Sequence, residues 1–552
     1  MVMTLVVLLA LGAYTVTSTI ELHLIDQSDE EALFTEMAYN QQAPGGLSND
    51  YYTGDQQQQY SQRPHPQQPP DYSQQQQYTP ENKQTFEQTF KVAKPKWNDL
   101  WAGILLIATF LGFVAVSGLS IQGYATTKSF NGEGIYDGNN DFGLSTNTVV
   151  LFAFVLVVAF ILSYAYLWGA RAFTKQFIWI TGIMQIVLGL GTAVYYFIKH
   201  YYPAAIAFAI FAVFYIFCFI SWIPRIPFSV LMLQTTIDVA KKHGHVFMVS
   251  FIGGLIGVAF AAWFSVTLVA IYIKYEPGNN PACGVNGVGC SSAKVIGLIA
   301  FVTFAAYWIS EWLKNTIHTT IAGVYGSWYF CSQKPGGFPK GATRGALRRA
   351  LTYSFGSISF GSLIVSLIQL LRHGVSIAQR QESASGNIVG SALLCVAGCL
   401  ISFLEWAVQF INHYAFSYIA LYGKAYFAAA KDTWTMMKDR GIDALVNDCL
   451  IDPVLTMGSL AIGYLCAFLA YLYLQFTSPK YNFNGSFTPV VMAFSFLIGM
   501  QICNIFMVPL KSGTATFFVA AAWDPQVLIT DFPDLYQRMV TVYPHVQQAI
   551  HA

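Results

Sequence analysis

Ten long apolar segments constrain this chain more than any other feature of its sequence. They lie at about 100–124, 148–168, 176–198, 203–223, 246–273, 295–313, 350–372, 389–410, 454–474 and 489–511. Each is close to the ~20 residues that a helix needs to span a ~30 Å hydrocarbon core. Backbone polar groups inside lipid must be satisfied within the chain, so each segment is expected to be helical. The sequence therefore predicts an all-α, polytopic membrane protein with about ten transmembrane helices, whose first partner is the lipid bilayer.

The composition agrees with a membrane protein and gives no support to several other classes. Hydrophobic residues make up 55% of the chain and charged residues only 10%, whereas soluble proteins carry about 25% charged residues. A formal net charge of +1 gives no reason to expect a nucleic-acid partner. The sequence contains no CxxC, HExxH, GxSxG or Gly-rich phosphate loop. We therefore expect no metal, no cofactor, no catalytic residue and no enzyme activity.

The two ends of the chain differ from the apolar region between them. Residues 1–36 resemble a signal segment, and we interpret them either as a wrongly assigned start before Met37 or as a real signal or anchor. Residues 37–95 are rich in Gln, Pro and Tyr and predict a disordered cytoplasmic tail, whose Pro–Tyr stretches are candidate docking sites for cytoplasmic adaptors. Residues 96–512 would then form the ten-helix transmembrane domain, and residues 513–552 a cytoplasmic C-terminal tail.

The distribution of Lys and Arg predicts the orientation. If the N-terminal tail is inside, only seven of the 29 Lys and Arg residues lie on the outer side: Lys128, Lys199, Lys274, Lys294, Arg372, Arg380 and Lys480. Cytoplasmic loops of membrane proteins carry an excess of basic residues. We therefore expect both termini to be cytoplasmic.

Two outer loops carry features that suit an extracellular location. Asn484 begins an Asn-Gly-Ser glycosylation sequon. Cys283 and Cys290 lie close together in another outer loop, where oxidation is permitted, and we predict a disulfide between them.

On the inner side, Pro224 and Pro227 are expected to end the fourth helix. Residues 228–242 that follow are either an amphipathic helix along the inner leaflet or an extension of the fifth segment.

Only two carboxylates lie inside the ten spans, Glu311 and Glu405. A carboxylate in lipid is costly unless it is paired or hydrated, which makes both of them candidates for function. Their neighbours on the same helix are Trp308, Asn315 and His318 around Glu311, and Trp406, Gln409 and Asn412 around Glu405. Positions three, four and seven residues apart share one face of a helix.

Two interpretations of these carboxylates remain open. They bind a substrate or coupling ion, or they are structural anchors that pair with Arg or Lys of the inner loops. At ~1.5 Å per residue, Glu311 would lie about 24 Å from the outer end of its span, nearer the cytoplasmic face than the midplane, and Glu405 lies similarly deep.

Small residues at 354–363, SFGSISFGSL, indicate either close helix packing or a helix interruption.

Several stretches together resemble the choline-transporter-like family. They are FISWIPRIPFS (219–229), NTIHTTIAGVYGSWYF (315–330), RRALTYSFGSISFGSLI (348–364), FLEWAVQFINHYAFSYIALYGKAYFAAAKD (403–432) and TATFFVAAAWDP (514–525). The similarity extends from about Lys96 to the C-terminus, and the Gln-rich tail fits the fungal branch of the family. The resemblance implies a ten-helix plasma-membrane protein whose animal relatives are linked to choline and related amines. Trp406 stands where those relatives have a basic residue, so no choline site is transferred residue by residue.

We expect a multi-pass plasma-membrane transporter of a small cationic solute. A quaternary ammonium group is recognised by aromatic faces, each worth up to ~2 kcal/mol when desolvated, and by a nearby carboxylate. The alternative is a non-transporting membrane scaffold or lipid-organising protein; a membrane-embedded enzyme comes third.

Overall fold

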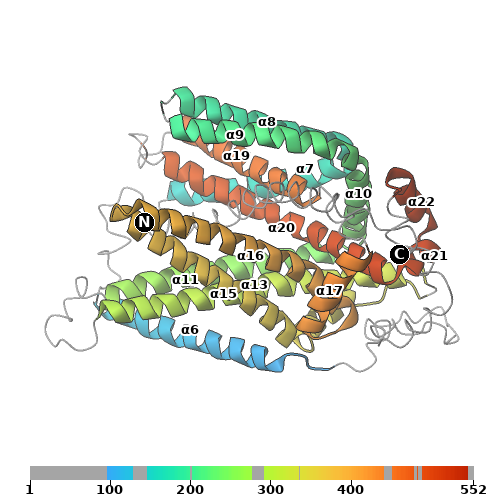
Figure 1. Cartoon of the computed structure of the whole chain (residues 1–552), viewed down its shortest axis with the longest axis horizontal. Helices are drawn as coiled ribbons and strands as arrows, with labels where there is room; N and C mark the ends of the chain where they lie inside the picture. The colour runs from blue at the N-terminus through green and yellow to red at the C-terminus, as the bar shows by residue number, and fades with distance from the viewer. Residues whose placement is uncertain are drawn as a thin grey trace.

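The computed structural model describes residues 96–127, 146–198, 200, 202–275, 291–334, 336–440, 451–477, 482 and 488–544. Within these residues the long helices run along the longest axis of the molecule, with short helices gathered at one end (Figure 1). The long helices are α6 (Leu100–Thr127), α7 (Thr146–Ala172), α8 (Thr174–Ile198), α9 (Tyr202–Trp222), α11 (His245–Tyr275), α13 (Ser292–Cys331), α15 (Phe355–Ala384), α16 (Ile388–Tyr422), α19 (Ile451–Thr477) and α20 (Thr488–Trp523). Ten candidate spans are long and apolar enough to cross a membrane, which confirms the predicted fold class.

Several helices are longer than the apolar windows predicted. The sixth span was expected to end at residue 313 and the eighth at 410, but α13 continues to Cys331 and α16 to Tyr422. Hydropathy falls at their polar residues, although neighbouring helices bury those side chains inside the bundle. The tenth helix likewise passes residue 512 and ends at Trp523, with Phe517, Phe518 and Val519 buried. The first residues of the expected C-terminal tail are therefore part of the packed helical domain.

The seventh span also differs from its predicted start at residue 350. A short helix, α14 (Ala342–Leu351), ends first, and α15 begins at Phe355 after a three-residue interruption. From Phe355 to Leu363 the helix is then continuous, and a Cβ atom at Gly361 would lie 2.4 Å from the Tyr426 ring and 2.6 Å from the Phe416 ring. Small residues here permit close approach of helices, so the packing interpretation is confirmed.

The short helices α10 (Ile226–Lys242), α14, α17 (Tyr426–Arg440), α21 (Pro525–Asp531) and α22 (Pro533–Val542) lie at one end of the bundle (Figure 1). A 3₁₀ turn over Ile223–Arg225 ends α9, as the two prolines predicted. Figure 1 shows α10 crossing the ends of the long helices at a steep angle. Because α10 ends at Lys242 and α11 begins at His245, residues 228–242 are a separate helix rather than an extension of the fifth segment.

Helix α10 is held by the protein itself. Its buried side chains include Phe228, Leu233 and Ile237. Arg171 at the end of α7 makes a two-pronged ion pair with Asp238, with Nε–Oδ1 and Nη2–Oδ2 distances of 2.6 and 2.7 Å. The apolar face expected to contact lipid therefore packs largely on the bundle.

Helix α13 is central to the bundle. It packs against α6, α11, α14, α15, α16 and α20. Its Trp308, Tyr325 and Tyr329 side chains are among the large buried residues. Side chains of α13 can therefore reach several helices that are distant in sequence.

The turn between α10 and α11 carries a half-buried histidine that yields a pH-dependent prediction. The His243 ring stacks on Phe338, with 3.7 Å between ring centroids. Burial, then the charges of Lys242 and His245, lower the pKa of His243 to about 4. The folded state thus favours the neutral ring, and this stabilisation is complete above about pH 6.5 and lost as the pH falls toward 4.

We expect that lowering the pH from 7.5 to 5 destabilises the protein through His243 by about 1–2 kcal/mol. The measurement is the thermal unfolding midpoint at both pH values for the wild type, His243→Gln and His245→Gln. Residue 245 is exposed and serves as the matched control. His243→Gln should lose less stability on acidification than the other two proteins, and an equal loss in all three would contradict the assignment.

Candidate functional site

Glu311 lies on α13 and faces α15. Its Oε1 accepts a hydrogen bond from Gln369 Nε2 at 3.2 Å. Its Oε2 lies 3.5 Å from Lys314 Nζ, one turn along α13. The Glu311 side chain is 7% exposed and that of Lys314 59%. The carboxylate is thus hydrogen-bonded by a neutral amide and lies at a long distance from the ammonium group of an exposed lysine. These contacts balance its negative charge only in part.

Glu405 on α16 has a closer partner. Arg372 Nε lies 3.2 Å from its Oε2, and the side chains are 22% and 4% exposed, respectively. Gln409 Nε2 donates to Glu405 Oε1 at 3.1 Å, as the same-face spacing predicted. Glu405 is therefore a buried, charge-paired carboxylate. The anchor interpretation expected a partner from the inner loops, but Arg372, which the sequence placed on the outer side, lies within α15.

Helix α15 connects the two carboxylates. Gln369 and Arg372 are three residues apart and share one side of that helix. One contacts Glu311 on α13, and the other contacts Glu405 on α16. The two carboxylates therefore belong to one network across three helices.

The network lies well inside the bundle, away from the beginning of α15. Ser357 Oγ, at the beginning of α15, donates to Asp99 Oδ2 beside the start of α6 at 2.7 Å. Gln369 is twelve residues farther along the helix, or about 18 Å. The network therefore lies near the middle of α15, which has 30 residues.

Two more predicted residues join α13 to α15. Trp308 is fully buried, and its Nε1 donates to the Ser359 carbonyl oxygen at 2.9 Å. Asn315 Nδ2 lies 2.9 Å from Ser362 Oγ. The predicted common face of α13 is thus confirmed, but the amide that contacts Glu311 comes from Gln369 and not from Asn315.

His318 belongs to a different junction, between α13, α16 and α20. Its Nε2 lies 2.8 Å from the His413 carbonyl oxygen and 3.0 Å from Ser417 Oγ, and its Nδ1 lies 2.9 Å from Ser512 Oγ. A carbonyl oxygen only accepts, so Nε2 carries the proton. In the neutral ring, Nδ1 then accepts from Ser512. His318 therefore fixes three helices together, about 10 Å along α13 from Glu311.

Within the described part of the chain, the ring contacts of Trp406 are to other aromatic residues of α16 rather than to either carboxylate. Its ring packs along α16, with centroids 5.6 Å from Phe403 and 5.8 Å from Phe410. These contacts indicate a packing role, although the residue adjoins Glu405 in sequence.

Sequence reasoning missed Gln369, Arg372 and Ser512 as site residues. The first two could have been found, because Ser362, Gln369 and Arg372 recur at helical spacing in the seventh segment. Ser512 had no local signal, since its relation to His318 depends on how α13 packs against α20.

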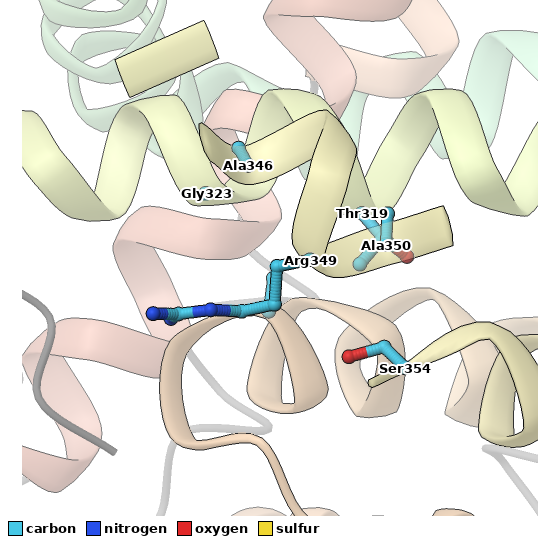
Figure 2. A pocket seen from close by; sticks show the side chains of 7 residues that line it. Thr319, Gly323, Ala346, Arg349, Ala350 and Ser354 are labelled. Atoms are coloured by element: carbon cyan, nitrogen blue, oxygen red, sulfur yellow. The ribbon is translucent and has the colours of Figure 1, made fainter. Parts of the chain in front are cut away.

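A narrow hollow lies farther toward the end of α13, between that helix, α14 and α16. It is lined by Thr319, Gly323, Ala346, Arg349, Ala350, Ser354 and Ala420. Figure 2 shows Arg349 as the one long side chain among small neighbours. None of these residues contacts Glu311 or Glu405 through the bonds described above.

Three predicted features fall outside the described residues: Cys283, Cys290 and Asn484. The disulfide and the glycosylation remain predictions. Within the described part of the chain, no group of three or more His, Cys, Asp and Glu side chains could hold a metal ion.

Comparison with known proteins identifies relatives of the whole helical region. Residues 206–526 match the family described as "Plasma-membrane choline transporter". The chain is 62% identical to Protein PNS1 of Gibberella zeae over 474 residues, covering 86% of this chain and 87% of the relative. It is 62% identical to Protein pns1 of Aspergillus fumigatus over 468 residues, covering 84% and 87%. Protein PNS1 of Saccharomyces cerevisiae is 43% identical over 468 residues, again covering 84% and 87%.

Proposed function

Because the chain belongs to the plasma-membrane choline transporter family, we propose that it carries a small cationic amine of the choline type across the plasma membrane. At family level it is a multi-pass membrane transporter. We further propose that both termini are cytoplasmic, that no enzyme activity is involved, and that the N-terminal tail docks adaptors. Entry of one positive charge gains ~2.3 kcal/mol per 100 mV, so uptake would need no coupled ion.

The proposal rests on a difference between the two carboxylates: the negative charge of Glu405 is balanced by a closer cation than that of Glu311. Glu405 has a guanidinium nitrogen at 3.2 Å. Among the described residues, the partners of Glu311 are the Gln369 amide and an exposed ammonium at 3.5 Å. A carboxylate inside a membrane bundle favours a nearby cation, and a transported amine would supply one.

The aromatic surroundings support the same ligand class. Trp308 lies three residues before Glu311 on the same side of α13, and Phe304 lies against Trp308 with 5.7 Å between ring centroids. Indole faces are the strongest aromatic partners of a quaternary ammonium group. We assign Glu311 as the charge-balancing residue and Glu405 as a structural anchor.

The alternative, a non-transporting scaffold or lipid-organising protein, is favoured by one observation. Both carboxylates are engaged by α15, and the hollow described above lies elsewhere. In that case Glu311 would serve only to hold α13 against α15.

Uptake by the purified protein in liposomes, screened over choline, ethanolamine and other amines, separates the two functions. Glu311→Gln should reduce the rate per folded molecule by at least about tenfold, a factor equivalent to ~1.4 kcal/mol. Glutamine keeps the size and the hydrogen bond to Gln369 but removes the charge. Asp534→Asn, at an exposed acid on α22, is the matched control and should transport normally.

No uptake of any amine by well-folded wild-type protein would favour the scaffold. A normal rate for Glu311→Gln would exclude this carboxylate from the transport mechanism.

A further inference from the structure

Two sequence motifs that the carboxylate network does not use meet at the end of the bundle occupied by the short helices. The first is Tyr422-Gly423-Lys424, and the second is the Trp523-Asp524 pair that closes α20. Tyr422 Oη donates a short hydrogen bond to Asp524 Oδ2. Tyr329 Oη of α13 donates to the Asp524 carbonyl oxygen at 2.9 Å. These bonds fix the ends of α16 and α20 against each other.

An aromatic cluster lies beside this junction. The Tyr418 ring is fully buried, and its centroid lies 4.6 Å from that of Tyr422 and 5.4 Å from that of Trp523. Three π-faces therefore gather within one turn of the Tyr422–Asp524 bond. Their electron-rich faces attract a cation.

The position over this cluster is taken by the protein's own ammonium group. Lys424 Nζ lies 5.5 Å from the centroid of the Tyr418 ring. The same nitrogen lies 2.7 Å from Asp432 Oδ2 of α17. Aromatic face and carboxylate together form the chemistry that recognises an organic ammonium.

The backbone leaves this lysine on a short connection between helices. Gly423 ends α16 with φ of 67°, in the left-handed region that suits glycine. Residues 423–425 then join α16 to α17 without helical structure. The side chains of Lys424 and Asp432 are 23% and 25% exposed, so the ion pair is reachable from solvent. A flexible lysine stem can leave such a position without unfolding a helix.

We propose that Tyr418, Tyr422, Trp523 and Asp432 form a second ammonium site, which Lys424 occupies as a tethered ligand and which a free amine cation takes when Lys424 moves away. The ligand class rests on the proposed function. The competing explanation is a purely structural ion pair that fastens the loop between α16 and α17, in which case removing the lysine exposes no ligand site.

The test uses the full-length purified protein and tetramethylammonium chloride as the probe, with binding measured by calorimetry. Lys424→Met keeps the apolar stem but removes the ammonium, and should lower the Kd for tetramethylammonium by about tenfold. Lys431→Met, at an exposed lysine on α17, is the matched control and should leave the Kd unchanged. Lys424→Gln gives the same comparison if the methionine variant does not fold.

The aromatic contribution is tested in the Lys424→Met protein. Adding Tyr418→Phe should keep the gain in affinity, because the ring face is retained, whereas Tyr418→Leu should abolish it. An unchanged Kd in both Lys424 variants, an equal gain in Lys431→Met, or a gain that survives Tyr418→Leu would each overturn the proposal.

These results are separable from the proposed function. Amine uptake that depends on Glu311, combined with no gain in binding on removal of Lys424, would reject the second site alone. A gain in binding that requires Tyr418, in a protein that transports no amine, would reject the transport function alone.

Discussion

Replacing Arg372 with glutamine is expected to destabilise the protein by about 3 kcal/mol, because Glu405 would keep its charge in the bundle without its partner. The Glu405 side chain is only 4% exposed, so water does not readily replace the guanidinium. The hydrogen bond from Gln409 to Glu405 is made by a neutral amide, which cannot balance the charge. The measurement is the thermal unfolding midpoint of the purified protein, together with its yield at the cell surface.

Two further variants show whether the effect comes from the pair. Arg380→Gln changes an exposed arginine on the same helix and should cost less than about 0.5 kcal/mol. The double variant Arg372→Gln with Glu405→Gln removes both charges and should recover part of the loss, because no unpaired charge remains. If the two single losses simply add in the double variant, Arg372 and Glu405 are not energetically coupled.

This experiment also separates the roles of the two carboxylates. A Glu405→Gln protein should be lost through poor folding, with a near-normal transport rate in the molecules that survive. Glu311→Gln should fold normally but transport slowly. The Gln369 amide can donate its hydrogen bond to a glutamine side chain as well as to the glutamate.

The fold could be predicted from the sequence because the bilayer sets the length of every span and requires its backbone hydrogen bonds to be made within a helix. The helix ends were harder to predict. Hydropathy falls at Asn315 and His318, yet α13 continues because other helices supply Ser362 and Ser512 as partners. Such partners become visible only when the helices are packed together.

The sequence predicted some residues of the candidate site and missed others. Glu311 and Glu405 are conspicuous as lone carboxylates, and Gln409 follows from local spacing. Gln369 and Arg372 depend on the register between α15 and its two neighbours, which no spacing within one segment encodes. The same limit applies to Tyr422 and Asp524, which meet although they lie far apart in the chain.

The close packing of α15 leads to the second large expected effect. A Cβ atom at Gly356 would lie 2.3 Å from the Asn98 carbonyl oxygen and 2.4 Å from that of Asp99. Both are backbone atoms, so no side chain can rotate to make room. The Asp99 carboxylate also accepts bonds from Ser357 Oγ and from the Tyr426 backbone nitrogen, at 2.7 and 2.8 Å. The start of α6 is therefore held in place against α15 and α17.

Gly356→Ala should consequently cost about 3 kcal/mol, at the upper end of ordinary overpacking, because relief requires α6 to move away from α15 and break the bonds of Asp99. Gly374→Ala in the same helix is the matched control, since no atom lies within 4 Å of its Cβ position. Alanine is the better helix former, so this control should be neutral or more stable by up to ~1 kcal/mol. The measurement is the thermal unfolding midpoint of both variants. If Gly356→Ala is as stable as Gly374→Ala, the start of α6 does not pack on α15 as closely as described. Asp99 then cannot be the residue that holds it there.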